Sequence, residues 1–249
     1  MRVTVLGKSP SWQDAGGACS GYLVQEDGYT LVLDCGSGAF GKLRASCDYA
    51  EVDAVLITHM HSDHFMDLIP FSNALRYGPR RLPRPRLHLP PGGAEVLRRA
   101  AEPGGAAGLV DAAFEADEYD PGAALELGPL RAELCPVPHY ISTHAVRLDA
   151  ADARFTFSAD TAPSDDLVRF ARDSDLLLIE ATLEEPETVG GRGHLTAAEA
   201  GEHGRRAGAR RLVLTHWSDE RDVELLRAQA GAAFGADVEL AAEGVAYSV

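Results

Sequence analysis

Lysine is nearly absent from this chain. Of the 23 basic residues, only Lys8 and Lys42 are lysines, and the others are arginines. Basic residues are also outnumbered by 38 acidic residues, which leaves a formal net charge of −15. A chain this acidic repels polyanions unless it builds a local basic patch. The composition therefore disfavours long nucleic acids as substrates, although a bound metal ion would still attract a small anion.

Cysteine motifs and long apolar runs are missing as well. The four cysteines, Cys19, Cys35, Cys47 and Cys135, form no C-x-x-C pair, so neither a zinc ribbon nor a redox motif is indicated. The N-terminus lacks the apolar run and cleavage site of a signal peptide, and no stretch is long enough to span a bilayer. We therefore expect a cytoplasmic protein that has free thiols and no contact with a membrane.

Short β-rich runs and helical patterns alternate along the whole chain. Strands are predicted at residues 3–7, 21–26, 30–36, 53–59, 86–90, 130–136, 145–148, 154–158, 176–180 and 212–216. Helices are predicted at residues 64–75, 94–101, 164–173, 196–207 and 220–233. No segment has the composition of a domain linker, so we expect residues 1–249 to form one α/β domain. In it, two mixed β-sheets pack face to face and helices flank both outer sides.

The most informative segment is residues 58–64, with the sequence THMHSDH. It places the imidazoles of His59, His61 and His64 and the carboxylate of Asp63 in a short stretch at the end of a predicted strand. Neutral imidazole and carboxylate are common ligands of zinc. The H-x-H spacing can direct two ring nitrogens at one ion, while the adjacent Asp-His pair faces a second ion. A chance cluster of surface histidines is a poor explanation for this spacing.

This segment resembles the H-x-H-x-D-H signature of the metallo-β-lactamase superfamily, and later segments resemble that family in the expected order. These are residues 135–139 (CPVPH), 157–161 (FSADT) and 212–216 (LVLTH), together with an early D-x-G turn at residues 34–36. The resemblance covers essentially the whole chain. It implies a four-layer αββα sandwich and two divalent metal ions per chain, zinc or alternatively manganese.

The resemblance also implies a set of metal ligands. One ion would be bound by His59, His61 and His139 and the other by Asp63, His64 and His216, with Asp160 bridging both. In related enzymes a hydroxide between the ions is the nucleophile, and the residue at the place of Asp63 acts as a general base. A structural role is the alternative for single residues: His139 as a turn cap, Asp160 as a helix N-cap, and His216 as a core or turn residue.

A second pair of motifs narrows the resemblance. Residues 180–182 (EAT) and 193–200 (GHLTAAEA) are similar to elements of the ribonuclease Z and phosphodiesterase branch. Thr196 and Glu199 have the spacing of a capping box, and a helix N-terminus is a natural phosphate site. We therefore assign His194 and Thr196 to substrate binding. His194 would bind a phosphate oxygen or protonate the leaving alkoxide, and Glu180 would orient His194.

The remaining histidines and the basic run are less informative. We consider His144 as a further substrate contact, although a structural role is the stronger interpretation. His88 either lines the pocket or is structural, and His203 is expected on the exposed side of a helix. The dense arginine run between Arg76 and Arg86 either steers an anion or forms a solvated loop.

The expected substrate follows from one difference between this chain and ribonuclease Z, the absence of a tRNA-binding arm. Ribonuclease Z carries a long arm for transfer RNA between the third His and the bridging Asp, and the segment from His139 to Asp160 is too short for one. The chain therefore resembles the atypical class II cyclic nucleotide phosphodiesterases. It departs from the class II signature at Ser62, where that class has Leu.

We therefore expect hydrolysis of 3′,5′-cyclic nucleotides, cAMP first. The alternatives are a ribonuclease Z-like nuclease acting on RNA 3′ ends, a lactonase or thioesterase of the same fold, and a non-catalytic nucleotide sensor. The predicted partner is a small nucleotide, and a homodimer is suggested by analogy with relatives.

Overall fold

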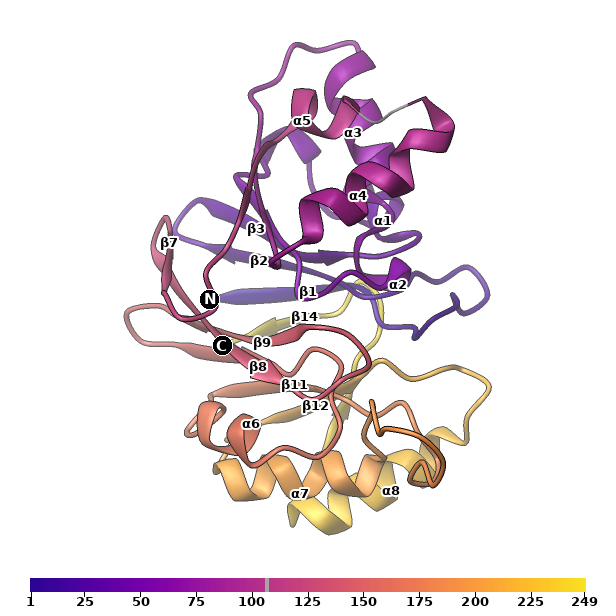
Figure 1. Cartoon of the computed structure of the whole chain (residues 1–249). Helices are drawn as coiled ribbons and strands as arrows, with labels where there is room; N and C mark the ends of the chain where they lie inside the picture. Colours follow the sequence, from indigo (N-terminus) through magenta and orange to yellow (C-terminus); the bar gives the residue numbers. More distant parts are fainter. Residues whose placement is uncertain (106–107) are drawn as a thin grey trace.

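Two seven-stranded mixed β-sheets form the centre of the molecule in the computed structural model, which describes residues 1–105 and 108–249 (Figure 1). The first sheet has the order β14 (Ala246–Ser248), β1 (Arg2–Gly7), β2 (Gly21–Glu26), β3 (Tyr29–Cys35), β4 (Ala54–Leu56), β5 (Arg86–Leu89) and β6 (Glu115–Glu118). The second has the order β13 (Glu239–Leu240), β12 (Leu212–Thr215), β11 (Leu176–Glu180), β10 (Arg154–Phe157), β9 (Thr143–Asp149), β8 (Leu130–Val137) and β7 (Leu125–Leu127).

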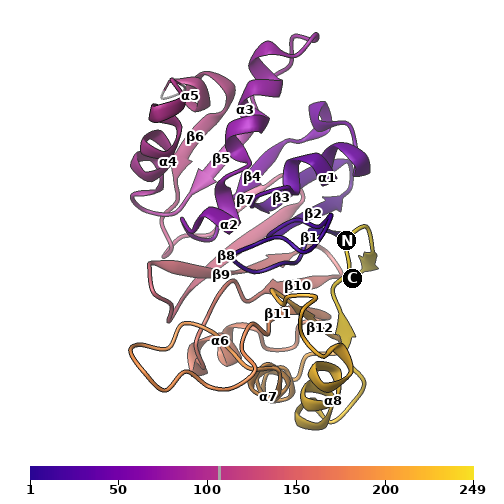
Figure 2. The same ribbon diagram turned by 90° about the vertical axis from the view of Figure 1, so that its right-hand side faces the viewer.

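Helices cover the outer side of each sheet. In the described part of the chain, five α-helices lie on the first sheet: α1 (Ala39–Ser46), α2 (Ser62–Phe65), α3 (Leu68–Tyr77), α4 (Gly93–Ala101) and α5 (Leu109–Ala113). Three lie on the second: α6 (Asp165–Phe170), α7 (Ala197–Ala207) and α8 (Val223–Phe234) (Figures 1 and 2). The four layers follow the order helix, sheet, sheet, helix, which confirms the predicted fold class.

The central strands are apolar on both faces, as expected for strands that are covered on both sides. In β3, Leu31 and Leu33 point into the core between the sheets, whereas Val32 packs against the helices. Tyr22 and Phe157 meet across the two sheets, with their ring centroids 4.9 Å apart. Alternating side chains thus bind each sheet to the other sheet and to its helical layer.

Strand direction determines where loops gather. Strands β3 to β6 are parallel to one another, and so are β10 to β13. Strand β8 also runs parallel to β10, because the two are separated by the antiparallel strand β9. The carboxyl ends of β4, β8, β10, β11 and β12 are therefore the places where a site can be built from several loops.

The predicted helix 64–75 is two helices with a corner between them. The backbone N–H of Asp67 donates to the carbonyl of Cys35 at 3.0 Å, and the Asp67 carboxylate accepts from the N–H of Phe40 at 2.9 Å. These contacts with β3 and α1 turn the chain between α2 and α3. The strands β6, β7, β13 and β14 were not predicted, because they are short and lie toward the sheet edges.

The expected exposure of His203 is wrong. Its side chain is only 4% exposed, because its Nδ1 donates to the carbonyl of Glu199 at 2.7 Å and its Nε2 accepts from the N–H of Ser164 at 3.0 Å. His203 therefore joins α7 to the start of α6.

In the described part of the chain, no helix has the length and apolar character needed to cross a membrane.

Gly36 permits the close approach of β3 to α2. A Cβ atom at this position would lie 1.8 Å from the carbonyl oxygen of Asp63, whereas a Cβ at Gly41 in α1 would meet nothing within 4 Å. We expect Gly36→Ala to lower the free energy of unfolding by about 3 kcal/mol or more, because the backbone of α2 must move.

The matched control, Gly41→Ala, should raise the free energy of unfolding by about 0.5–1 kcal/mol, since it replaces a helical glycine. Chemical denaturation of both variants measures the difference. Equal stability of the two variants would contradict the role given to Gly36.

Candidate metal centre

The predicted ligands follow the ends of four strands and converge between the two sheets. His59 lies three residues beyond β4, His139 two residues beyond β8, Asp160 three residues beyond β10, and His216 immediately after β12. The remaining predicted ligands, His61, Asp63 and His64, lie in and before α2. Each sheet therefore contributes about half of the candidate site.

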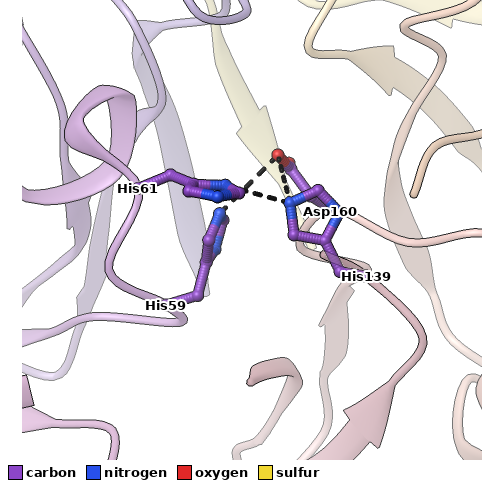
Figure 3. A group of neighbouring side chains, drawn as sticks. All are labelled: His59, His61, His139 and Asp160. Carbon is purple, nitrogen blue, oxygen red and sulfur yellow. Dashed lines mark hydrogen bonds and ion pairs between the residues drawn. The ribbon is translucent and has the colours of Figure 1, made fainter. Parts of the chain in front are cut away.

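Two groups of potential ligand atoms share one carboxylate. The first contains His59, His61, His139 and Asp160, and Figure 3 shows their side chains directed toward a common point. The second contains Asp63, His64, Asp160 and His216. Within each group, one ligand atom of every residue lies within 4.8 Å of the others. The grouping is the one that the resemblance implied, with Asp160 common to both.

Asp160 lies at the centre of the arrangement. Its Oδ2 is 3.3 Å from Nε2 of His64, 3.5 Å from Nε2 of His216, 3.7 Å from Nε2 of His59 and 3.8 Å from Nε2 of His139. A carboxylate in contact with imidazoles from both groups has the position that a bridging ligand requires.

The carboxylate of Asp34 orients two imidazoles on the side of the first sheet, those of His59 and His64. Its Oδ2 accepts from Nδ1 of His64 at 2.7 Å and from the hydroxyl of Thr58 at 2.9 Å, and its Oδ1 accepts from the N–H of Thr58 at 2.8 Å. The Thr58 hydroxyl in turn accepts from Nδ1 of His59 at 3.0 Å. Both rings therefore present Nε2 toward Asp160, which is the outer-contact pattern of metal-binding histidines.

Residues of the second sheet orient His139 and His216 in the same manner. Nδ1 of His139 donates to the carbonyl of Gly193 at 2.7 Å. Nδ1 of His216 donates to the hydroxyl of Thr182 at 2.7 Å, and this hydroxyl donates to Oε2 of Glu180 at 2.6 Å. Four imidazoles thus have Nδ1 fixed by an acceptor and Nε2 left for the centre.

The side chains fit a pair of metal ions. Nε2 of His59, Nε2 of His64 and Oδ1 of Asp160 are buried and have no hydrogen-bond partner among the described residues. An unpartnered buried polar atom costs about 1–3 kcal/mol, and three at one point are expected where a ligand satisfies them. The nitrogen and oxygen donors are those that zinc and related ions prefer.

The electrostatics of the group also favour cations. Burial lowers the pKa of His59, of His61 and of His139, so these rings are held in the neutral form that binds metal. Burial raises the pKa of Asp63, but its proximity to His64 and His216 outweighs this effect and lowers the pKa to about 2. Asp63 is therefore an anion at neutral pH.

Three residues around the centre have a left-handed backbone although they are not glycine. These are Asp34 with φ 56°, Ala159 with φ 51° and His216 with φ 55°. Such conformations cost of order 1–3 kcal/mol and persist where surrounding contacts enforce them. The strain coincides with the carboxylate that orients the metal loop and with two strand ends at the site.

His194 and Glu180 form a pair beside the proposed ligands. Nδ1 of His194 donates to Oε1 of Glu180 at 2.9 Å, and the His194 ring lies 4.9 Å from the ring of His139 and 5.5 Å from that of His216. Glu180 also accepts from the N–H of Thr161 at 2.7 Å. Burial alone would lower the pKa of His194, but the hydrogen bond and charge of Glu180 raise it to about 9.

Thr196 and His144 have structural contacts of their own. Thr196 caps α7 in the predicted capping box with Glu199, and that role occupies its hydroxyl. His144 is 3% exposed and its Nδ1 lies 3.2 Å from the hydroxyl of Tyr119. The structure does not bring His144 into the group of proposed ligands, so its assignment as a substrate contact finds no support in the geometry.

Other residues singled out in the sequence are engaged away from the centre. Nδ1 of His88 contacts Asp117 at 2.7 Å. In the arginine run, Arg80 forms a paired contact with Asp48, and Arg84 donates to the carbonyl of Asp111. These contacts favour the interpretation of the run as a solvated loop.

Several residues that orient the proposed ligands through hydrogen bonds were given no role in the sequence analysis. The Thr182 hydroxyl and the Gly193 carbonyl both lie in the quoted motifs, but no role was assigned to them. Glu187 was missed because only the fold places its carboxylate against the N–H of Gly193, at 2.8 Å. The adjacency of Thr182 to Glu180 and of Gly193 to His194 was the available signal.

Comparisons with known sequences show the family that the chain resembles along most of its length. A sequence model of the family described as "Beta-lactamase superfamily domain" matches residues 29–217. The probable metallo-hydrolase YhfI of Bacillus subtilis is 29% identical over 99% of both chains. An uncharacterised protein of Mycobacterium leprae is 32% identical over 100% of this chain and 89% of its own length. Ribonuclease Z of Myxococcus xanthus is 28% identical over 98% of this chain and 96% of its own length.

Solved structures show the same fold. The crystal structure of YhfI superposes with a TM-score of 0.89 at 26% identity, covering 99% of both chains. The short form of human tRNase Z has a TM-score of 0.78 at 21% identity, covering 100% of this chain and 99% of that one. Yeast PDE1 has a TM-score of 0.72 at 13% identity with the same coverage. At these two lower identities the likeness concerns the fold alone.

The ligand geometry predicts about two transition-metal ions per chain after reconstitution with zinc. Asp160→Ala should reduce the bound metal to one ion or fewer and weaken the remaining site, because the carboxylate contacts both groups. Elemental analysis after desalting, compared with Asp152→Ala in the exposed β9–β10 turn, measures this. Absence of uptake by the unmodified protein, or two tightly bound ions in Asp160→Ala, would contradict the assignment.

Proposed function

The chain belongs to the β-lactamase superfamily, and from this premise we propose that it is a two-metal phosphodiesterase that hydrolyses 3′,5′-cyclic nucleotides, with cAMP as the favoured substrate. The observation that carries the proposal is the His194–Glu180 pair, which lies against two proposed ligands, His139 and His216. The set of seven potential ligands supports metal-dependent hydrolysis. The imidazole of His194, which is additional to this set, supports a reaction in which the leaving group needs a proton.

Each residue has a separate task in this proposal. The two groups of proposed ligands that share Asp160 would hold two metal ions, which would supply Lewis acidity toward phosphoryl oxygens and a water nucleophile that is active near neutral pH. Asp63, which is an anion at neutral pH, would orient the attacking water and accept its proton as the new bond between the water oxygen and phosphorus forms. His194 donates Nδ1–H to Glu180, so Nε2 is the nitrogen that transfers a proton to the ribose oxygen as the ester bond breaks.

A small substrate is favoured over a transfer RNA precursor. The chain between His139 and Asp160 is fully described, and it consists of the paired strands β9 and β10 with a short turn between them. It therefore has no projecting arm in this segment. The net charge of −15 also opposes binding of a long polyanion.

A ribonuclease Z-like nuclease is the second candidate. The identity of 28% with a ribonuclease Z along nearly the whole chain favours it. A lactonase or thioesterase is less well supported, because the His194–Glu180 pair suits a phosphate ester better. A nucleotide sensor without catalysis would have no need for the full set of ligands.

The substrate assignment predicts that the zinc- or manganese-loaded protein cleaves cAMP and bis-p-nitrophenyl phosphate but not precursor tRNA. Product analysis by chromatography, with and without a chelator, measures all three. Cleavage of precursor tRNA would move the protein to the ribonuclease Z interpretation. If the metal-loaded protein cleaves the nitrophenyl ester but not cAMP, the cyclic nucleotide assignment is excluded, whereas metal-dependent phosphodiesterase activity is retained.

The proposed acid role of His194 predicts a loss that depends on the leaving group. His194→Ala should lower the turnover number for cAMP by about 10²–10⁴-fold and leave the metal content unchanged. For bis-p-nitrophenyl phosphate the loss should be smaller, because nitrophenolate leaves without a proton. Steady-state kinetics on both substrates, together with elemental analysis, provide the measurement.

His88→Ala is the matched control, because it removes an imidazole that contacts Asp117 away from the centre. Equal losses on the two substrates in His194→Ala would indicate phosphate binding in place of acid catalysis. Depleted metal in that variant would place His194 among the ligands.

A further inference from the structure

The candidate site is open to solvent on one side. His61 and His194 are partly exposed, whereas the side chains of His59, His64 and His139 are fully buried. A substrate must therefore approach past the rings of His61 and His194. A side chain that lies next to these rings would contact the part of the substrate that extends away from the phosphate.

Tyr140 occupies this position. It follows His139 directly, and its ring centroid is 4.8 Å from that of His139 and 5.6 Å from that of His194. Its side chain is 51% exposed. Trp12 and Tyr77 are also exposed aromatic residues, but neither has a ring contact with the proposed ligands among the described residues.

The Tyr140 ring is held in place and is not a loosely exposed side chain. Its hydroxyl donates to Oε1 of Glu187, and Oε2 of Glu187 accepts from the N–H of Gly193 at 2.8 Å. Three ring atoms lie 2.4–2.7 Å from the point that a Cβ of residue 193 would occupy. Only glycine allows the ring to lie this close to the backbone at residue 193.

A fixed aromatic ring with exposed surface beside a phosphate site suits one class of ligand. Nucleobases stack on such rings with about 1–3 kcal/mol per base, and they do so without a compensating charge. A charged ligand group is less suited to this place, because the nearby Glu187 carboxylate is already used by Tyr140 and Gly193. The larger ring system of a purine would bury more of the exposed tyrosine than a pyrimidine.

We propose that Tyr140 is the stacking residue for the nucleobase of a nucleotide whose phosphate group lies at the metal centre. This inference rests on the proposed function, because it takes the substrate to be a nucleotide. It identifies the part of the chain that distinguishes a nucleotide from a simple phosphate ester and that favours purines.

Binding measurements test the inference without requiring turnover. Isothermal titration of the zinc-loaded protein with AMP, CMP and ribose 5-phosphate compares ligands with a purine, a pyrimidine and no base. The unmodified protein should bind AMP roughly tenfold or more tightly than ribose 5-phosphate, with CMP between the two. Tyr140→Ala should remove most of this difference, whereas Tyr140→Phe, which keeps the ring, should retain it.

Tyr77→Ala is the control, because it removes another exposed tyrosine, which lies at the end of α3. Equal weakening of AMP and ribose 5-phosphate in Tyr140→Ala, with the same loss in Tyr140→Phe, would show that the tyrosine only anchors the Glu187 loop. An unmodified protein that does not prefer AMP to ribose 5-phosphate would overturn the inference. Tight AMP binding without cAMP cleavage would refute the proposed function and leave the stacking residue intact.

Discussion

The buried carboxylate of Asp34 is the contact on which the candidate metal centre most depends. It is fully buried at the end of β3, and it accepts hydrogen bonds from Thr58 and His64 while its own backbone is held in the left-handed region. A buried anion is costly unless it is fully hydrogen-bonded, so the positions of the Thr58 loop and of α2 are tightly constrained by it. Gly36, two residues later, allows α2 to come close enough for these bonds to form.

The two sheets make the site together. The first sheet holds His59 and His64, and the second holds His139 and His216, with Asp160 between them. The spacing of the two groups is therefore set by the apolar core between the sheets, which is close-packed and resists compression. This arrangement explains how residues separated by more than a hundred positions in the chain meet at distances of 3.3–3.8 Å from one oxygen atom.

Much of this centre could be predicted from the sequence because its signals are local. The H-x-H-x-D-H loop follows a single strand, and the capping box of Thr196 and Glu199 spans one helical turn. Contacts between distant elements could not be predicted in this way. The burial of His203 depends on Ser164, and the corner between α2 and α3 depends on Phe40. Periodicity places a side chain on one face of an element, but it does not indicate which neighbour covers that face.

The loop before α7 cannot be treated as a separate substrate-binding appendage. Its Gly193 accepts a hydrogen bond from His139 through the carbonyl and donates one to Glu187 through the N–H. Glu187 also accepts from the Tyr140 hydroxyl, so the residue proposed to contact the base and a proposed metal ligand share one short path of hydrogen bonds. Exchanging this loop for that of a relative would therefore alter the orientation of His139 as well as substrate preference. Substitutions of residues that contact the substrate and of residues that orient the metal ligands are consequently expected to occur together within this fold.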